Sequence, residues 1–342
     1  MLSYPCPSCG ADLEFAPGTA VLRCPHCGHE TAIAGSAAAI GRHPYDQLIR
    51  SRRRRVAYAG ATVFSCPGCE ARTETTNLAR RCPFCGTPLV TEANPREQFV
   101  PDGVLPFAVD RAGLLDHVRR WIGHRPLAPD ALKQVTELES WRSTYLPHWV
   151  FDATLAPDPR WHRVPEMRSA ARTRVRQSDV TVPASAVVPT ADQTALAPWS
   201  LASARPLTPE FLEGHEAVRY DVEPDAAVDT AKATMLDRVR EAREGSRDIA
   251  LSSSYTSWDL WKDPHYSGLD VALVLLPVWV CTYVYRGRDF HVYLNGDTGT
   301  ASGEFPESRF KVALMLIGFF VGLAAVTGVV LCLYLLKEQM FS

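Results

Sequence analysis

The sequence predicts a multidomain α+β protein with two small four-cysteine modules near the amino end and one transmembrane helix at the carboxyl end. Eight of the ten cysteines lie in four Cys-x-x-Cys pairs, the middle of the chain mixes helical and strand-like hydrophobic patterns, and residues 312–336 carry no charge. A chain of 342 residues is long enough for two or three compact domains. We expect cysteine modules at 1–35 and 61–92, an arginine-rich linker at 36–60, α+β units at 93–225 and 226–310, and a transmembrane helix at 311–337.

The cysteine pairs form two sets with the spacing of tetrahedral metal sites. In each set, 14 or 12 residues separate two Cys-x-x-Cys knuckles, so a hairpin can bring four sulfur atoms around one ion. Glycine follows the second cysteine in three of the four pairs, where it suits a turn with positive φ. The pattern predicts two zinc ribbons with two structural zinc ions, held by Cys6, Cys9, Cys24 and Cys27 and by Cys66, Cys69, Cys82 and Cys85.

Other uses of these thiols stay open. Rubredoxin-like iron takes the same four thiolates, whereas a thiol–disulfide pair requires a lone Cys-x-x-Cys in a thioredoxin-like setting. His26 and His29 flank the first set and are alternative ligands. A closed four-cysteine site leaves no open position for water or substrate, so we expect structural metal and no metal-ion catalysis.

Composition argues against two classes of protein. The formal net charge of -2 opposes nucleic-acid binding driven by overall basicity. The amino-terminal residues lack the apolar core of a signal peptide, which opposes a disulfide-rich secreted protein. Cys281 and Cys332 lie in apolar runs, where a thiol behaves as a small hydrophobic group.

The linker between the cysteine sets is rich in arginine. It contains Arg50 and the run Arg52–Arg55, which indicates either contact with the phosphates of nucleic acid or lipid, or a solvated segment. Few aromatic residues lie near it to stack on bases, so nucleic-acid binding is weakly supported.

Hydrophobic periodicity predicts three helices in the middle region. The first covers 114–122, with Asp110 as its N-cap and Pro126 beyond its end. The second covers 132–141, where Leu132, Val135, Leu138 and Trp141 share a face, and the third covers 226–243, with an apolar stripe of Val228, Ala231, Met235, Val239 and Ala242. Residues 157–225 are rich in proline and arginine without a clear period, which predicts strand or long loop.

Two short segments match each other at four of five positions. They are Leu146–Val150, "LPHWV", and Leu276–Val280, "LPVWV", and they predict two related helix-plus-sheet units about 130 residues apart. The alternative explanation of the match is coincidence, because a proline is common at the start of a strand. After the second segment we expect a β-meander, with turns at 286–287 and 295–299, in which Asp297 is a turn residue rather than a catalytic or metal-binding carboxylate.

The apolar segment Val312–Leu336 predicts a transmembrane helix. Its 25 residues would form a helix about 37 Å long, which exceeds the ~30 Å hydrocarbon core, and it lacks the polar stripe of a soluble core helix. Only six residues follow, so we expect a tail anchor. Arg309 and Lys311 precede it, and the positive-inside rule then predicts a cytoplasmic membrane location with the amino-terminal domains in the cytoplasm.

Two glycines in this segment have the spacing of a helix-packing motif. Gly318 and Gly322 form a Gly-x3-Gly pattern, which lets two membrane helices approach closely. The pattern predicts a homodimer or contact with another membrane helix, although glycine is also common in membrane helices without such a role.

Together, these motifs resemble a bacterial family of membrane-anchored double zinc-ribbon proteins. The resemblance rests on the paired CPxCG ribbons, on "YLPHWVFDA", and on "LLPVWVCTYVYRGRDFHVYLNGDTGTASGEFPESRFK" before the apolar segment, and it covers most of the chain. Members are often labelled transcription-factor-IIB-type zinc-ribbon proteins or mislabelled as primosomal helicase-like, and the meander is similar to a small PepSY-type fold. Some are linked to phage-shock membrane-stress proteins, which implies an adaptor that helps bring such proteins to the membrane. The chain lacks the Gly-x4-Gly-Lys-Ser/Thr loop that a helicase needs for triphosphate.

The sequence therefore predicts a tail-anchored adaptor whose cytoplasmic ribbons recruit a soluble protein to the inner membrane. Tethering a binding surface in the bilayer raises the local concentration of its partner. The alternative is a membrane-tethered zinc-ribbon regulator that binds nucleic acid through the ribbons and Arg52–Arg55. We do not expect an enzyme, because the common hydrolase, metalloprotease and phosphate-loop motifs are absent and His148 and the Asp263–His265 pair are isolated.

Overall fold

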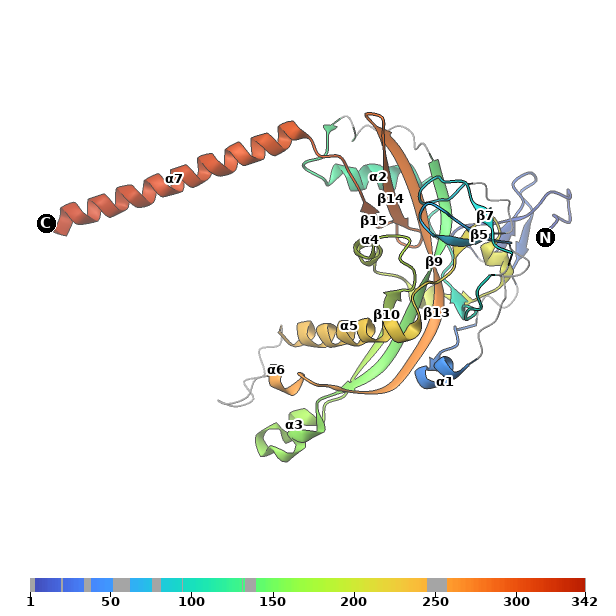
Figure 1. Cartoon of the computed structure of the whole chain (residues 1–342), viewed down its shortest axis with the longest axis horizontal. Helices are drawn as coiled ribbons and strands as arrows, with labels where there is room; N and C mark the ends of the chain where they lie inside the picture. Colours follow the sequence, from blue (N-terminus) through green and yellow to red (C-terminus); the bar gives the residue numbers. More distant parts are fainter. Residues whose placement is uncertain are drawn as a thin grey trace.

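Two long antiparallel strands form the centre of the molecule (Figure 1). β9 (Ser140–Ala156) and β13 (His265–Tyr285) pair from Ala156 opposite His265 to Ser140 opposite Thr282. Their central side chains are buried at consecutive positions. A strand covered on both faces needs apolar residues without alternation, which explains the continuous hydrophobic runs of the sequence.

This computed structural model describes residues 4–19, 21–33, 38–51, 62–75, 81–93, 95–130, 132, 140–244 and 257–341. The other strands are β1 (Glu14–Phe15), β2 (Val21–Arg23), β3 (Glu30–Ala32), β4 (His43–Pro44), β5 (Thr62–Ser65), β6 (Arg72–Thr75), β7 (Val90–Thr91), β8 (Gly103–Val104), β10 (Val175–Pro183), β11 (Arg205–Pro206), β12 (Glu216–Val218), β14 (Arg288–Asn295) and β15 (Ala301–Gly303).

The described residues also form α-helices and short 3-10 helices. The α-helices are α1 (Tyr45–Arg50), α2 (Leu114–Gly123), α3 (Arg168–Ala171), α4 (Thr190–Ala195), α5 (Pro224–Glu244), α6 (Ser257–Leu260) and α7 (Arg309–Phe341), and the 3-10 helices are η3 (Pro159–Arg163), η4 (Pro165–Met167), η5 (Leu201–Ser203) and η6 (Pro209–Leu212). Residues 157–225, which show no clear period, thus form many short elements around the strand β10 rather than one long loop.

The strands belong to two sheets. β1, β2 and β3 form an antiparallel sheet in the first cysteine module. The larger sheet runs in the order β11-β8-β13-β9-β12-β6-β5-β7, with β10 on β9, β4 and β14 on β13, and β15 on β14. The second cysteine module, which contains β5, β6 and β7, is therefore an extension of the central sheet.

The two Leu-Pro-x-Trp-Val segments lie opposite each other in the central ladder. Leu146 faces Leu276, so two similar segments run in opposite directions from one point. The indole N–H of Trp149 donates to the Val222 carbonyl at 2.8 Å, in front of α5, while that of Trp279 donates to the Val109 carbonyl at 2.9 Å, in front of α2. Each tryptophan thus fixes the start of one helix.

The surroundings of the two tryptophans correspond as well. The Phe107 ring meets Trp279 with centroids 5.1 Å apart at 62°, and the Tyr220 ring meets Trp149 with centroids 5.4 Å apart at 61°. β8 pairs in parallel with β13, and β12 pairs in parallel with β9. The chain therefore places a short strand, a helix and a long strand twice in the same relative arrangement.

Two of the three predicted helices are confirmed. α2 packs on β14 and β15, and α5 packs on β9 and β10. The buried residues of the two helices are Leu114, Val118 and Ile122 in α2, and Ala227, Val228, Ala231, Met235 and Val239 in α5. Ala242, which was predicted to belong to the buried stripe of α5, is exposed.

Two details of the helix predictions are wrong. Trp141 lies in β9 opposite Cys281 and not on a helix, because pairing with β13 extends the strand to Ser140; residues 133–139 lie outside the described residues. Asp110 accepts the N–H of Gly113 at 2.9 Å and so stabilises the turn before α2, whose N-cap is Gly113.

The predicted meander is present in β13, β14 and β15. Arg286 and Gly287, with φ of 53° and 72°, form the first turn. In the second connection the positive φ falls on Gly299, at 76°, and not on Gly296. Asn295 organises this connection, since its side-chain oxygen accepts the N–H of Asp297 at 2.8 Å, and the Asp297 carboxylate in turn accepts the Ser200 N–H at 2.9 Å.

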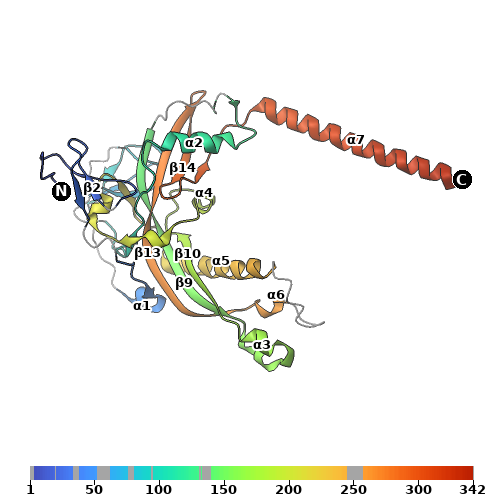
Figure 2. The same ribbon diagram turned by 180° about the vertical axis from the view of Figure 1, so that it is seen from behind.

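The carboxyl-terminal helix α7 stands away from the other elements in both views (Figure 1, Figure 2). Its stretch Arg309–Val329 has a mean hydropathy of 2.4 with no buried share, so this helix is long and apolar enough to cross a membrane. A Cβ added at Gly318 or Gly322 would meet no described atom within 4 Å, so a homodimer through these positions stays a prediction.

Candidate metal centres

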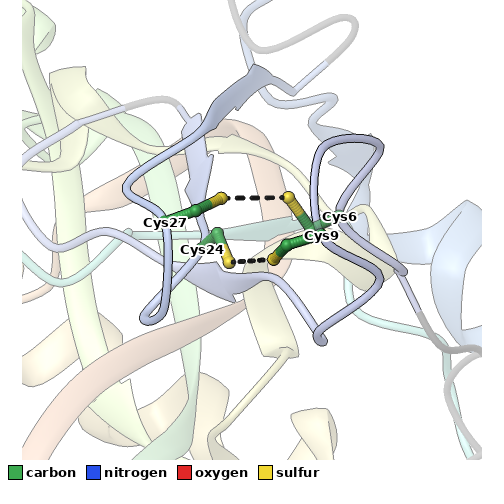
Figure 3. A group of neighbouring side chains, drawn as sticks. All are labelled: Cys6, Cys9, Cys24 and Cys27. Atoms are coloured by element: carbon green, nitrogen blue, oxygen red, sulfur yellow. Dashed lines mark hydrogen bonds between the residues drawn. The ribbon is translucent and has the colours of Figure 1, made fainter.

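The fold brings the first four cysteines together (Figure 3). The Sγ atoms of Cys6 and Cys27 lie 3.5 Å apart, as do those of Cys9 and Cys24, and all four fall within 4.8 Å of one another. A disulfide requires about 2.05 Å, whereas four sulfurs at about 2.3 Å from one tetrahedral ion lie about 3.8 Å apart. The separation therefore fits a shared metal ion and not a disulfide.

The second set of cysteines has the same geometry. The Sγ atoms of Cys66 and Cys85 lie 3.4 Å apart, those of Cys69 and Cys82 lie 3.5 Å apart, and the four again fall within 4.8 Å of one another. In each cluster the first cysteine of each knuckle is buried and the second is more exposed. Both clusters could hold a metal ion, with one edge covered by the protein and the other facing solvent.

All four knuckles use one kind of turn. In each, the residue after the second cysteine donates its N–H to the carbonyl of the first cysteine at 2.9 or 3.0 Å. This residue adopts a left-handed conformation in every case: Gly10 at φ 78°, Gly28 at 75°, Gly86 at 71° and Glu70 at 59°. The knuckle sequence thus fixes the sulfur positions locally, and Glu70 accepts a conformation that otherwise favours glycine.

Backbone N–H groups stabilise the thiolate form of Cys24. The Cys27 amide, opposed by burial and helped by the His26 amide, lowers the pKa of the Cys24 thiol to about 6. The flanking histidines are not part of the described cluster: His26 is exposed, and the His29 Nδ1 lies 3.1 Å from the Ser8 hydroxyl. The donor set is therefore four sulfurs, which suits a soft or borderline ion.

The first module is built into the hydrophobic core of the body. Phe15 meets Phe211 edge to face with centroids 5.6 Å apart, and Cys6, Leu13 and Leu22 belong to the same buried cluster as Phe211. The Gly18 N–H donates to the Phe107 carbonyl at 2.7 Å. The first cysteine module therefore packs against the body and is not joined to it by the polypeptide chain alone.

The second module is joined to the central sheet through β6. β6 pairs with β12 so that Glu74 lies opposite Ala217. The Glu74 carboxylate forms a buried ion pair with Arg219, whose guanidinium also donates to the Arg96 carbonyl at 2.7 Å. A buried pair of this kind is strongly sensitive to removal of one partner, since the remaining charge is left in a poorly solvated place.

The other residues noted in the sequence do not join these clusters. Arg50 is exposed at the end of α1, and Arg52–Arg55 lie outside the described residues. Burial lowers the pKa of His148 to about 4. The Asp263 carboxylate accepts a hydrogen bond from the Arg160 guanidinium at 3.1 Å, and His265 takes no part in this contact. Cys281 is buried in β13, where burial raises the pKa of its thiol to about 12.

Sequence reasoning missed a buried polar pair beside the first module. His215 stacks on Phe107 with centroids 4.6 Å apart, and neither of its ring nitrogens has a hydrogen-bond partner among the described residues. Burial raises the pKa of the adjacent Glu216 to about 7, and Arg142, 3.9 Å away, acts in the opposite direction. His215 and Trp279 help line a cavity of about 810 Å³. No motif marks these residues, because only the folded chain buries them.

The Glu74–Arg219 pair gives the first prediction. Glu74→Leu should lower the free energy of unfolding by about 3–5 kcal/mol, because it leaves the Arg219 charge buried and unpaired. Adding Arg219→Met should recover most of the loss, since neither charge then remains. Chemical denaturation of the single and double variants measures both values, and a double variant as unstable as the single one would contradict the argument.

Glu216 gives a prediction on pH. Its folded pKa of about 7 lies above the reference value of 4.5, so the folded chain binds this proton more tightly than the unfolded chain. The resulting stabilisation is complete below pH 4.5 and is lost as the pH rises to about 7. Glu216→Gln should remove up to about 3 kcal/mol of this pH dependence. Denaturation curves at pH 5.5 and pH 8 check it, and an unchanged pH dependence would contradict burial as its source.

Comparison with known proteins adds one relative. No family model matches the chain, and no solved structure matches it. The chain is 26% identical over 338 residues to the uncharacterized protein YdjG of Bacillus subtilis (strain 168), an alignment that covers 94% of this chain and 95% of the relative. The similarity thus extends over almost the whole of both chains and is not confined to the cysteine modules.

Proposed function

We propose that this protein is a membrane-anchored zinc protein that recruits a soluble protein partner to the membrane. The observation that carries the proposal is the arrangement of two closed cysteine clusters and an apolar helix on one body. The first module and α7 lie on opposite sides of the central sheet in both views (Figure 1, Figure 2). A partner bound at the modules would therefore be held near the bilayer by α7 of this chain. The partner itself would not have to contact α7.

Zinc is the ion that these clusters suit best. Four thiolates in a closed arrangement are the usual ligands of structural zinc, which would contribute on the order of 10–16 kcal/mol to folding. Rubredoxin-like iron uses the same ligands. The metal in this proposal fixes the shape of each module, and the exposed knuckle residues around it form the surface offered to a partner.

The membrane orientation in this proposal follows from charge. Arg309 and Lys311 flank the apolar stretch on the side of the body, and positive flanking residues favour the cytoplasmic side. Free thiols persist in a reducing compartment, which supports the same orientation. The resemblance to membrane-anchored zinc-ribbon proteins supports a membrane-stress protein as the partner.

The second module ends in an edge strand beside its cluster. β7 lies at the end of the central sheet order, and its Val90 is 57% exposed. An edge strand presents unpaired backbone groups with which another chain can pair. We place the partner contact on β7 and on the exposed knuckle of Cys85.

The duplicated arrangement around Trp149 and Trp279 supports an origin of the body by internal repetition. In this proposal, each half supplies a short strand, a helix and a long strand, and each helix packs on strands of the other half. Neither half can then bury its hydrophobic face alone, so the two halves form one rigid support for the cysteine modules.

Metal analysis tests the metal assignment. Elemental analysis of the purified chain should give two zinc ions, and the double variant Cys66→Ser with Cys82→Ser should keep one, because the first cluster has its own ligands. Acidification should release both ions, since protons compete for the thiolates. A red, iron-containing protein or a metal-free folded chain would overturn this assignment.

A matched pair of valine variants tests recruitment. Val90→Glu should abolish capture of the partner from detergent-solubilised membranes, while Val284→Glu, at a 47% exposed valine in β13, should leave it unchanged. Both variants should keep the metal content and thermal stability of the parent chain. Fragment 1–310 should keep the partner and leave the membrane fraction.

The same experiment separates the alternatives. Capture that disappears after nuclease treatment would favour the nucleic-acid regulator over the adaptor. Equal capture by Val90→Glu and the parent chain would exclude β7 as the contact. Retention of fragment 1–310 on carbonate-washed membranes would show that α7 is not the anchor.

A further inference from the structure

A basic cavity lies where the body meets the apolar helix. It has a volume of about 380 Å³ and is lined from one side by α2 and the residues after it, and from the other by the connection between β14 and β15. The lining residues are His117, Arg120, Trp121, His124, Arg125, Gly299, Thr300 and Ala301. None of these residues is acidic, and four of them carry basic side chains.

The cations of this cavity are not neutralised within the described part of the chain. Arg120 and Arg125 form no ion pair there, in contrast to Arg119, which binds Asp116 at 3.6 Å on the same helix. Arg120 Nη1 instead lies 3.3 Å from His117 Nδ1. Guanidinium groups without a counter-ion favour binding of an anion.

The cavity wall is held in place by specific contacts. His117 Nδ1 lies 3.0 Å from the Gly299 carbonyl oxygen, and a Cβ added at Gly299 would lie 2.0 Å from the His117 ring. Only glycine at this position, with its φ of 76°, lets the imidazole sit against the loop. The basic side chains therefore lie around a shallow, solvent-open cavity whose wall is fixed by these contacts.

Two aromatic rings lie beside Arg125, and one of them, Trp121, lines the cavity. The Arg125 guanidinium lies 5.0 Å from the Trp121 ring centroid and 5.4 Å from that of Phe305. The two rings meet edge to face with centroids 6.0 Å apart. The indole N–H of Trp121 has no acceptor among the described residues. Tryptophan beside arginine is typical of the level of lipid headgroups.

Hydrogen bonds fix this cavity close to the start of the apolar helix. The Ser308 N–H donates to the Leu127 carbonyl at 2.8 Å, and the Lys311 ammonium donates to the Ala128 carbonyl at 2.9 Å and to Asp130 at 2.6 Å. Both views show α2 beside the point where α7 leaves the body (Figure 1, Figure 2). The apolar run begins at Val312, one residue beyond Lys311, so the cavity lies at headgroup level if α7 spans a bilayer.

The equivalent helix α5 differs from α2 at most of these positions. Val109 and Val222 accept the same tryptophan hydrogen bond, and counting onward from each places Arg120, Trp121 and His124 at the positions of Ala233, Thr234 and Asp237 in α5. Arg125 corresponds to Arg238, so a basic residue at that position is common to both segments. The buried faces of both helices remain apolar at the corresponding positions. Apart from Arg125, the basic and aromatic residues of the cavity thus have no basic or aromatic counterpart on α5.

We propose that this cavity binds the phosphate of an anionic phospholipid headgroup, with Arg120 and Arg125 as the principal contacts. The inference rests on the proposed insertion of α7 into a bilayer. A volume of about 380 Å³ accommodates a glycerophosphate group. Because no carboxylate lines the cavity to attract a choline or ethanolamine amine, a lipid with net negative charge binds more tightly than a zwitterionic one.

A titration of the full chain in non-ionic detergent tests the proposal. Calorimetry with dioctanoyl phosphatidylglycerol should show one saturable site, with dioctanoyl phosphatidylcholine weaker by about tenfold or more. The double variant Arg120→Glu with Arg125→Glu should weaken phosphatidylglycerol binding by at least about tenfold. The matched control, Lys232→Glu with Arg238→Glu on α5, changes the charge equally and should stay within about twofold of the parent chain.

Each contrary outcome overturns the proposal. Equal affinity for the two lipids would exclude charge recognition, and saturation by inorganic phosphate at the same concentration would exclude the lipid as the ligand. Unchanged binding by the Arg120 and Arg125 variant would exclude this cavity. Metal content and thermal unfolding show that the variants are folded, and Arg120→Gln replaces the double variant if it is not.

Carbonate extraction of membranes separates this inference from the proposed function. A chain that resists extraction but shows no preference for phosphatidylglycerol keeps its anchor and lacks the headgroup site. A chain that carbonate removes from membranes has no α7 anchor, and the proposed function then fails whether or not detergent-solubilised protein binds the lipid.

Discussion

The register between β9 and β13 is the constraint on which the rest of the structure depends. With Leu146 opposite Leu276, Trp149 and Trp279 project from the two strands in the same way and each reaches the carbonyl that precedes a helix. A shift of one residue would turn every side chain of a strand to its other face. Both tryptophans would then lose their acceptors, and α2 and α5 would lose the positions from which they cover the sheet.

The cysteine modules gain their rigidity from this central pairing. A module of about 30 residues is too small for a sufficient core of its own, so packing against the body must contribute to its stability. The first module shares Phe15 with the core of the body, and the second adds β6 to β12 beside the buried Glu74–Arg219 pair. Metal binding at either cluster would therefore be coupled to folding of the body through these shared contacts.

The body is also joined to the apolar helix by more than the peptide chain. The segment after α2 binds the backbone of Ser308 and the side chain of Lys311, so the first turn of α7 has a fixed contact with the segment that follows Arg120 and Arg125 in the chain. α2 and α5 pack on the sheet through apolar buried residues, but their outer faces differ. The buried residues are constrained by packing on the sheet, whereas the outer residues are not.

The sequence by itself determined the features that depend on near neighbours along the chain. Cys-x-x-Cys spacing predicted both sulfur clusters, helical periodicity predicted α2 and α5, and an uninterrupted apolar run predicted a helix fit to cross a membrane. Tertiary structure alone decided that Trp141 belongs to a strand, that α2 packs on β14 and β15 and α5 on β9 and β10, and that His215 and Glu216 are buried. Strand pairing and burial depend on contacts between residues that are far apart in the chain. Such contacts leave no local pattern in the sequence from which they could be predicted.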